Sequence, residues 1–273
     1  MTNSKIQMLS IVKRLAYYFR IWLMMSKNSF ITYFQSRVGA LIFLTGKTLR
    51  FIFFIGFLFY ILKNTGNLAG YSLNQAIFFF VTFNVVDVFA QFLFREVYRF
   101  RPLVISGNFD LVLVKPVNAL FRSLMGGADL YDLITIPPLI FAVYYLGSQL
   151  NPSLLHTAFY ILLLLNGLLI AAAFHIAVIS FGIITLEIDH SIMIYRDVIS
   201  LGRLPIDIYR EPLRGALTYL IPVGIMMTFP AKALMGLITS TGIFFSFILG
   251  GILLFASLRF WNYALKQYTS ASS

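Results

Sequence analysis

The chain has 273 residues, of which 59% are hydrophobic and only 11% are charged, whereas an average soluble domain has about 25% charged residues. This is too little charge to cover the exterior of a soluble protein of this size, so part of the surface must face lipid. The absence of cysteine excludes disulfides, thiolate nucleophiles and sulfur-ligated metals, and three histidines supply few ligands for other metals.

The net charge of +11 requires an anionic partner. A nucleic-acid interface needs a folded polar surface to carry its basic residues, and the chain has little such surface. Anionic lipid headgroups are the other source of counter-charge. We therefore expect membrane lipids, and no nucleic acid, to balance the positive charge.

Residues 5–37 have the pattern of an amphipathic helix, because apolar residues recur every three or four positions and basic residues fall between them. The apolar set is Ile6, Leu9, Val12, Ala16, Phe19 and Leu23, and the basic set is Lys13, Arg14, Arg20 and Lys27. We expect an interfacial helix on the inner leaflet, with its cations among lipid phosphates. The alternative is an ordinary cytoplasmic helix docked on a partner.

Long uncharged stretches follow this segment, and a membrane crossing needs about 20 mostly apolar residues. The fifth stretch is the least regular because it contains Pro222 and Pro230, and a re-entrant turn is expected near 230–237. The predicted spans lie near 42–62, 74–94, 130–147, 154–180, 215–230 and 236–258. The sequence therefore predicts an all-α integral membrane protein, a single domain over 1–273, with six transmembrane helices preceded by the amphipathic interfacial helix.

Lysine and arginine predict the orientation of these spans. With both termini in the cytoplasm, 19 of the 21 basic residues lie on the inner side, and Lys63 and Lys232 are the exceptions. This asymmetry follows the positive-inside rule. The outer loops are too short for a receptor or catalytic domain, so any soluble partner is expected at the cytoplasmic face.

Four polar residues within the predicted spans are candidates for the transport pathway, since ionisable groups in a membrane are rare and usually functional. Lys47 and Arg50 lie one helical turn apart at the inner end of the first span, where they either extend to the headgroups or contact an anionic substrate. Asp87 is expected to face the bundle interior or a partner subunit. His175 either pairs with Asp87 or hydrogen-bonds a neighbouring helix.

No catalytic, cofactor or metal site is expected in this chain. Gly46-Lys47-Thr48 matches the end of a phosphate-binding loop, but Leu41 stands where the first glycine is required, and the residues lie in a span. No cluster of carboxylates, histidine or serine converges on one membrane face, which disfavours a lipid-modifying enzyme.

The segment GNFDLVLVKPVNALFR at 107–122 is a turn-bounded element on the predicted inner face. Gly107-Asn108 forms a turn, Asp110 can cap the helix that follows, and Lys115-Pro116 ends it. Such a short element suits docking to another protein.

Here the sequence resembles the ABC-2-type permeases, specifically a small six-span bacterial subfamily of ABC exporter permeases. The resemblance runs over nearly the whole chain and rests on NTGNLAGYSLNQAIFFF at 64–80, on Gly107, Asp110, Leu113, Lys115, Pro116 and Asn118, on LPIDIYREPLR at 204–214, on IPV at 221–223, on FPAKALMG at 229–236, and on the terminal RFWNYALKQYTSASS. It implies a subunit of the bacterial inner membrane that pairs with a second permease and with two ATPase subunits, which bind the ATP and Mg. The ATPase-coupling region implied by the resemblance comprises Arg99, Arg101, Gly107, Asp110, Lys115, Pro116 and Asn118.

The expected function is thus the permease subunit of an ATP-binding cassette exporter, which forms half of the translocation pathway. The alternative is an ion-driven secondary transporter or a small channel. Such carriers tend to show several converging intramembrane ionisable groups and internal repeats, which the sequence lacks. Lipid, peptide, polysaccharide precursor and drug all remain open as substrates.

Overall fold

The computed structural model describes residues 3–34, 37–186 and 188–269. Glu187 and the last four residues of the chain lie outside the described residues, as do the side chains of Ile6 and Leu9. Within the described ranges the structure is all helical apart from turns and one isolated bridge between Leu68 and Tyr71. The long helices are α1 (Asn3–Phe34), α2 (Arg37–Thr65), α3 (Leu73–Phe94), α7 (Leu130–Gln149), α8 (Leu154–Thr185), α9 (Ile188–Ser200) and α12 (Ser240–Gln267). The short ones are α4 (Phe100–Ile105), α5 (Phe109–Leu113), α6 (Ala119–Leu124), α10 (Leu213–Gly215) and α11 (Phe229–Leu234).

Five of the described helices, namely α2, α3, α7, α8 and α12, are long and apolar enough to cross a membrane, and a bent helical pair makes six if it counts as one span. Several of these helices start at a side-chain cap. The side-chain oxygens of Ser72, Asp129, Ser153 and Thr239 each accept a hydrogen bond from a backbone N–H in the first turn, which satisfies a donor that has no partner within the helix. The all-α membrane fold predicted from the sequence is confirmed.

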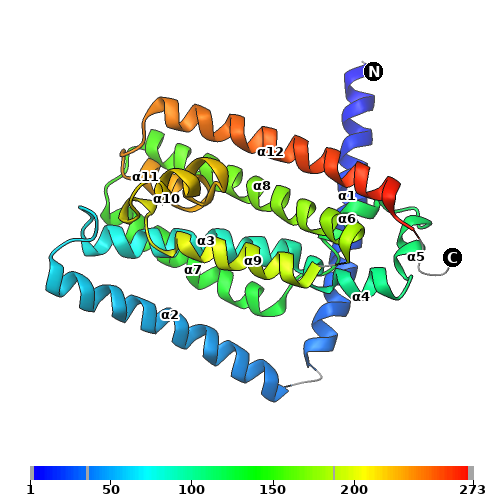
Figure 1. The fold of residues 1–273 in the computed structure, drawn as a ribbon, viewed down its shortest axis with the longest axis horizontal. Helices are drawn as coiled ribbons and strands as arrows, with labels where there is room; N and C mark the ends of the chain where they lie inside the picture. The colour runs from blue at the N-terminus through cyan, green and yellow to red at the C-terminus, as the bar shows by residue number, and fades with distance from the viewer. Residues whose placement is uncertain (1–2, 35–36, 187, 270–273) are drawn as a thin grey trace.

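The bundle has two distinct ends (Figure 1). We call the end that carries α1, α4, α5 and α6 the α1 end, and the end that carries the turns at 66–72, 150–153 and 235–239 the far end. Between them α8 packs closely on α12, where the Asn166 side chain donates a hydrogen bond of 2.9 Å to the Ser246 carbonyl. A Cβ atom added at Gly167 would lie 2.8 Å from the Met226 carbonyl oxygen. Glycine at position 167 and serine at position 246 therefore allow α8 to approach its neighbours closely.

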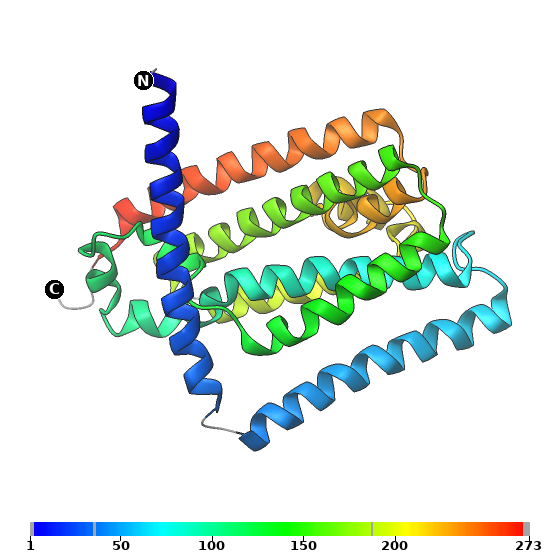
Figure 2. The same cartoon turned by 180° about the vertical axis from the view of Figure 1, so that it is seen from behind.

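α1 crosses the ends of the other helices almost at right angles to them (Figure 2). Its bundle side is formed by Tyr18, whose ring lies 4.8 Å from that of Phe121, and by Trp22, whose ring lies 5.6 Å from that of Phe92. Ser26 is buried on the same side and accepts a hydrogen bond from the Ala128 N–H. These contacts fix α1 across the α1 end of the bundle.

The apolar residues predicted for the interfacial helix do not face the bundle. Val12, Phe19 and Leu23 are exposed, as is Leu15 beside them. An exposed apolar stripe on a helix that lies across the ends of membrane spans is the arrangement of an interfacial helix. Lys13, Arg14, Arg20 and Lys27 are exposed as well.

The predicted topology places the connection between the spans near 154–180 and 215–230 on the inner side. Residues 188–207 of this connection follow a different path in the structure. α9 begins at the α1 end, where Arg101 pairs with Asp189 at 3.4 Å. At the far end, Asp207 accepts a hydrogen bond of 2.9 Å from the Tyr71 hydroxyl and pairs with Lys232 at 2.8 Å. Tyr71 precedes α3 and Arg101 follows it, so the segment runs along the whole length of α3.

A bent helical pair stands where the sequence predicted a fifth span near 215–230. Leu213–Leu220 and Gly224–Leu234 meet at an angle of 78°. The break lies at 221–223 and not near 230–237, because a proline disfavours helical geometry in the residue before it, and Ile221 is extended before Pro222. Pro230 lies in the first turn of α11, where proline is tolerated.

This path also changes the distribution of the basic residues. The guanidinium of Arg203 lies 6.0 Å from the centre of the Phe83 ring, halfway along α3, and Arg210 and Arg214 follow Asp207 at the far end. Three of the 19 basic residues assigned to the inner side therefore do not lie at the α1 end.

Candidate functional site

A cavity of about 530 Å³ lies between α2 and the helices α3, α7 and α9. It brings together three of the four intramembrane residues that the sequence singled out, namely Lys47 and Arg50 from α2 and Asp87 from α3. The other polar side chains of its lining are Thr48, Asn84, Gln91, Arg95, Thr135 and Arg196. Ligand sites in proteins have volumes of about 300–1,000 Å³ and a few convergent polar groups, so this cavity is the candidate site.

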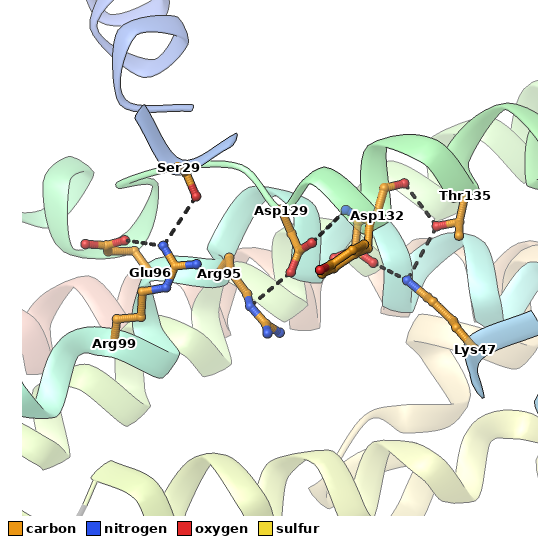
Figure 3. Close-up of polar contacts among 9 residues, drawn as sticks. Ser29, Lys47, Arg95, Glu96, Arg99, Asp129, Asp132 and Thr135 are labelled. Carbon is orange, nitrogen blue, oxygen red and sulfur yellow. Dashed lines mark hydrogen bonds and ion pairs between the residues drawn. The ribbon is translucent and has the colours of Figure 1, made fainter. Parts of the chain in front are cut away.

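Lys47 is held by α7 (Figure 3). Its ammonium pairs with the Asp132 carboxylate and lies 3.4 Å from the Thr135 hydroxyl. Only 3% of the Asp132 side chain is exposed, so the lysine compensates a buried carboxylate. Lys47 therefore does not extend to the headgroups in this structure. Asp132, which the sequence analysis treated only as part of a span, is a second intramembrane acid beside Asp87.

A second ion pair lies at the α1 end of the cavity. The Nε atom of Arg95 lies 3.2 Å from the Asp129 carboxylate, and that carboxylate also accepts a hydrogen bond of 2.8 Å from the Tyr131 N–H. One turn further, Arg99 donates a hydrogen bond of 3.4 Å to the Ser29 hydroxyl of α1 (Figure 3). These contacts connect α1, α3 and the start of α7.

Arg50 and Arg196 differ from Lys47 and Arg95, because neither has an ion-pair partner in the part of the chain that the structure describes. Both side chains are exposed. The Arg196 guanidinium lies 5.8 Å from the centre of the Tyr98 ring. These two guanidinium groups can therefore contact a ligand without breaking an existing ion pair.

His175 lies outside the cavity. Its imidazole is buried in α8, with Nδ1 2.8 Å from the carbonyl oxygen of Ala171 on the same helix. The rings of Phe94 and Tyr195 lie 5.3 and 4.8 Å from it. Neither predicted partner, Asp87 or a neighbouring helix, forms a hydrogen bond with it among the described residues.

The predicted coupling element forms a compact cap at the α1 end. Gly107 has a φ of +73°, the left-handed turn that favours glycine, and it places Phe109 in the core against Phe100. Asp110 accepts a hydrogen bond of 2.9 Å from the Tyr268 hydroxyl. Burial, together with the hydrogen bond to the Asp110 carboxylate and its negative charge, raises the pKa of Tyr268 to about 12, so this hydroxyl remains a donor at neutral pH.

The residues that follow the buried Phe109 and the half-buried Asp110 form an exposed surface. Leu111, Val114, Lys115 and Pro116 are exposed, and 78% of the Val114 surface is accessible. The Asn118 side chain then caps α6 by accepting a hydrogen bond of 3.0 Å from a backbone N–H. The structure thus places an apolar and basic patch, which we call the α5 patch (Leu111, Val114, Lys115 and Pro116), at the extremity of the molecule.

The seven residues predicted for coupling have different positions. Lys115 and Pro116 belong to the α5 patch, whereas Gly107, Asp110 and Asn118 shape the backbone around it. Arg99 and Arg101 contact their own chain, at Ser29 and Asp189 respectively.

Neither a phosphate loop nor a metal cluster is found in the described residues. Gly46, Lys47 and Thr48 lie inside α2, a continuous helix and not a loop. The described ranges contain no group of three or more metal-ligating side chains.

Comparison of the chain with protein-family models identifies one matching family. The model of the ABC-2 family transporter protein matches residues 47–272, a range that includes the residues of the cavity from Lys47 onward and the whole coupling element. No curated protein and no solved structure matches at a significant level. Because the family match extends over most of its length, the chain belongs to the ABC-2 transporter family.

Proposed function

We propose that the chain is the permease subunit of an ATP-binding cassette exporter. It forms half of the translocation pathway with a second permease subunit, and separate ATPase subunits bind the ATP and Mg that drive transport. Its location is a bacterial inner membrane, with both termini in the cytoplasm. Family membership supports this proposal, and the observation that carries it is the α5 patch at the α1 end.

The α5 patch is well placed to transmit a displacement to the bundle. The segment is connected to α3 through α4, to α7 through α6, and to the end of α12 through the Tyr268–Asp110 hydrogen bond. Phe109 anchors it in the core, against Phe100 and Trp261. A partner that moves α5 therefore moves three spans together.

The test is reconstitution of the full chain with a candidate ABC ATPase subunit. Val114→Asp and Lys115→Glu change the α5 patch without touching a span. Loss of contacts at such an interface is expected to weaken ATPase docking at least about tenfold. Stimulated ATPase activity and transport should fall accordingly, while the amount of inserted protein stays constant.

Lys63→Glu is the matched control, because Lys63 is an exposed lysine at the far end of α2. It should leave docking unchanged. If both α5 patch variants assemble, stimulate ATP hydrolysis and transport as the wild type does, α5 is not the docking surface.

The ion-driven carrier is the second candidate, because Asp87 is a half-buried carboxylate in the cavity and such groups often carry protons in transporters. Proteoliposomes that contain this chain alone distinguish the two functions. Uptake driven by a proton gradient and abolished by Asp87→Asn would favour the carrier over the permease.

A further inference from the structure

The cavity contains more cationic than anionic groups. Two of its cations are compensated, since Lys47 pairs with Asp132 and Arg95 with Asp129. Arg50 and Arg196 are not compensated in this way, and within the described lining Asp87 is the single acid.

Arg203 does not line the cavity, but its charge acts on groups that do. Its guanidinium interacts electrostatically with Arg50, Asp87 and Arg196, and its Nε atom is buried without a hydrogen-bond partner among the described residues. Three guanidinium groups thus share one carboxylate. Uncompensated charge within a membrane span is costly, so an anion bound here would be stabilised by the surplus.

The lining also changes along the helices. Gln91 and Asp87 on α3, and Arg95 directly after it, lie toward the α1 end, whereas Phe80 lies toward the far end. On α7 the order is the same, because Thr135 comes first and Pro138, Leu139 and Ala142 follow. On α2 the polar Lys47, Thr48 and Arg50 lie between Ile42 and Phe43, which are nearer the α1 end, and Phe51 and Ile52, which are nearer the far end. The part of the lining toward the far end is therefore apolar, and the cationic groups lie on its α1 side.

We infer that this cavity binds an amphiphile with an acidic head group. Arg50 and Arg196 contact the phosphate or carboxylate, and Phe51, Phe80 and Leu139 contact the apolar chain. The inference rests on the proposed function, because it names the substrate class of the same permease. A phosphate or carboxylate fits the planar guanidinium groups through paired charge-assisted hydrogen bonds. A cationic drug would be repelled by the same groups.

Dodecyl phosphate is a suitable probe, because it combines an acidic head group with an alkyl chain. Native mass spectrometry of the full chain, released from a neutral detergent, counts the bound molecules. Three comparison probes separate the contribution of the acidic head group from that of the alkyl chain. They are dodecylphosphocholine, dodecyltrimethylammonium and inorganic phosphate. Dodecyl phosphate is expected to bind at least about tenfold more tightly than each of them, since loss of either the charged contacts or the apolar contacts removes a large share of the affinity.

The variant Arg50→Gln/Arg196→Gln removes two of the three guanidinium groups that share Asp87, and it breaks no ion pair among the described residues. It should bind dodecyl phosphate about tenfold more weakly or worse. Arg259→Gln is the matched control, because Arg259 is an exposed arginine on α12 outside the cavity lining, and it should bind as the wild type does. Circular dichroism and the unfolding temperature confirm that each variant is folded.

Three outcomes would overturn the inference. Equal binding by the wild type and the double variant, or equal affinity for dodecyl phosphate and dodecyltrimethylammonium, excludes a cationic head-group site. Inorganic phosphate bound as tightly as dodecyl phosphate excludes the amphiphile and leaves a simple anion site. Because binding is measured without an ATPase, these failures are separate from the loss of ATPase coupling that would contradict the proposed function.

Discussion

The ammonium of Lys47 on α2 pairs with the carboxylate of Asp132 in the first turn of α7, 85 residues further along the chain. α2 is otherwise largely exposed, and its ring contacts to α3 are those of Phe51 and Phe54 with Phe80. The ion pair therefore joins α2 to α7 at the wall of the cavity, while Leu58 and Leu62 pack on α3 further along the helix.

Lys47→Met is expected to destabilise the chain by about 3 kcal/mol, because Asp132 would remain buried without its cation. Adding Asp132→Asn should restore most of the loss, since asparagine has no charge to compensate. Thermal unfolding of the purified full chain measures both effects, with Lys63→Met as a control at an exposed lysine of the same helix. Equal destabilisation of the single and double variants would show that the pair is not what stabilises this contact.

The helical class and most of the spans can be predicted from the sequence, because long uncharged stretches leave few alternatives to a membrane helix. The exposed surface at Lys115-Pro116 is also predictable, since its turn residues and polarity are local signals. Ion pairs between distant helices cannot be predicted from such local signals. Nothing in the sequence near Lys47 points to Asp132, because the contact depends on how α2 and α7 lie side by side.

The path of residues 188–207 could not be predicted for a related reason. This segment contains the charged residues Asp189, Arg196 and Arg203. A hydropathy scale treats each of these charges as exposed to water, so the segment scores as a loop. In the structure Asp189 pairs with Arg101, and the guanidinium groups of Arg196 and Arg203 lie near the rings of Tyr98 and Phe83. Ile192 and Ile199, spaced by two helical turns, are buried between them. That spacing was the available signal for a buried helix face.

Gly167→Ala is expected to destabilise the chain by about 1–3 kcal/mol, because the added methyl group would lie 2.8 Å from the Met226 carbonyl oxygen. The contact is with backbone, which cannot turn away as a side chain can. Gly251→Ala is the reference substitution, since nothing lies within 4 Å of its Cβ position, and alanine should stabilise that helix slightly. Unfolding temperatures of the two variants compare them directly. A Gly167→Ala protein as stable as Gly251→Ala would contradict the close approach of α8 to the bent pair.

Tyr268→Phe is expected to loosen α5, because it removes the hydroxyl that donates to Asp110 and nothing else. A hydrogen bond to a charged group contributes about 2 kcal/mol, so amide hydrogen exchange should accelerate in residues 107–113.

The raised pKa of Tyr268 determines the pH range over which this hydrogen bond stabilises the chain. The stabilisation is complete below the ordinary tyrosine pKa of about 10 and is lost only as the pH rises through about 12. The difference between wild type and variant should therefore be constant from pH 7 to 9. Tyr263→Phe, at an exposed tyrosine of the same helix, should leave exchange in α5 unchanged.

The path of residues 189–207 along α3 gives the last prediction, which concerns Arg214. If this segment crosses the membrane, Arg214 lies on the outer side, whereas the sequence analysis assigned it to the cytoplasm. The chain has no cysteine, so single cysteines can be labelled with a membrane-impermeant maleimide on intact cells. Arg214→Cys is expected to react as Asn67→Cys does, at an exposed position of the far end, and not as Ser106→Cys does, at an exposed position of the α1 end. Labelling of Arg214→Cys only after the cells are permeabilised, together with Ser106→Cys, would instead place residues 188–214 on the inner face.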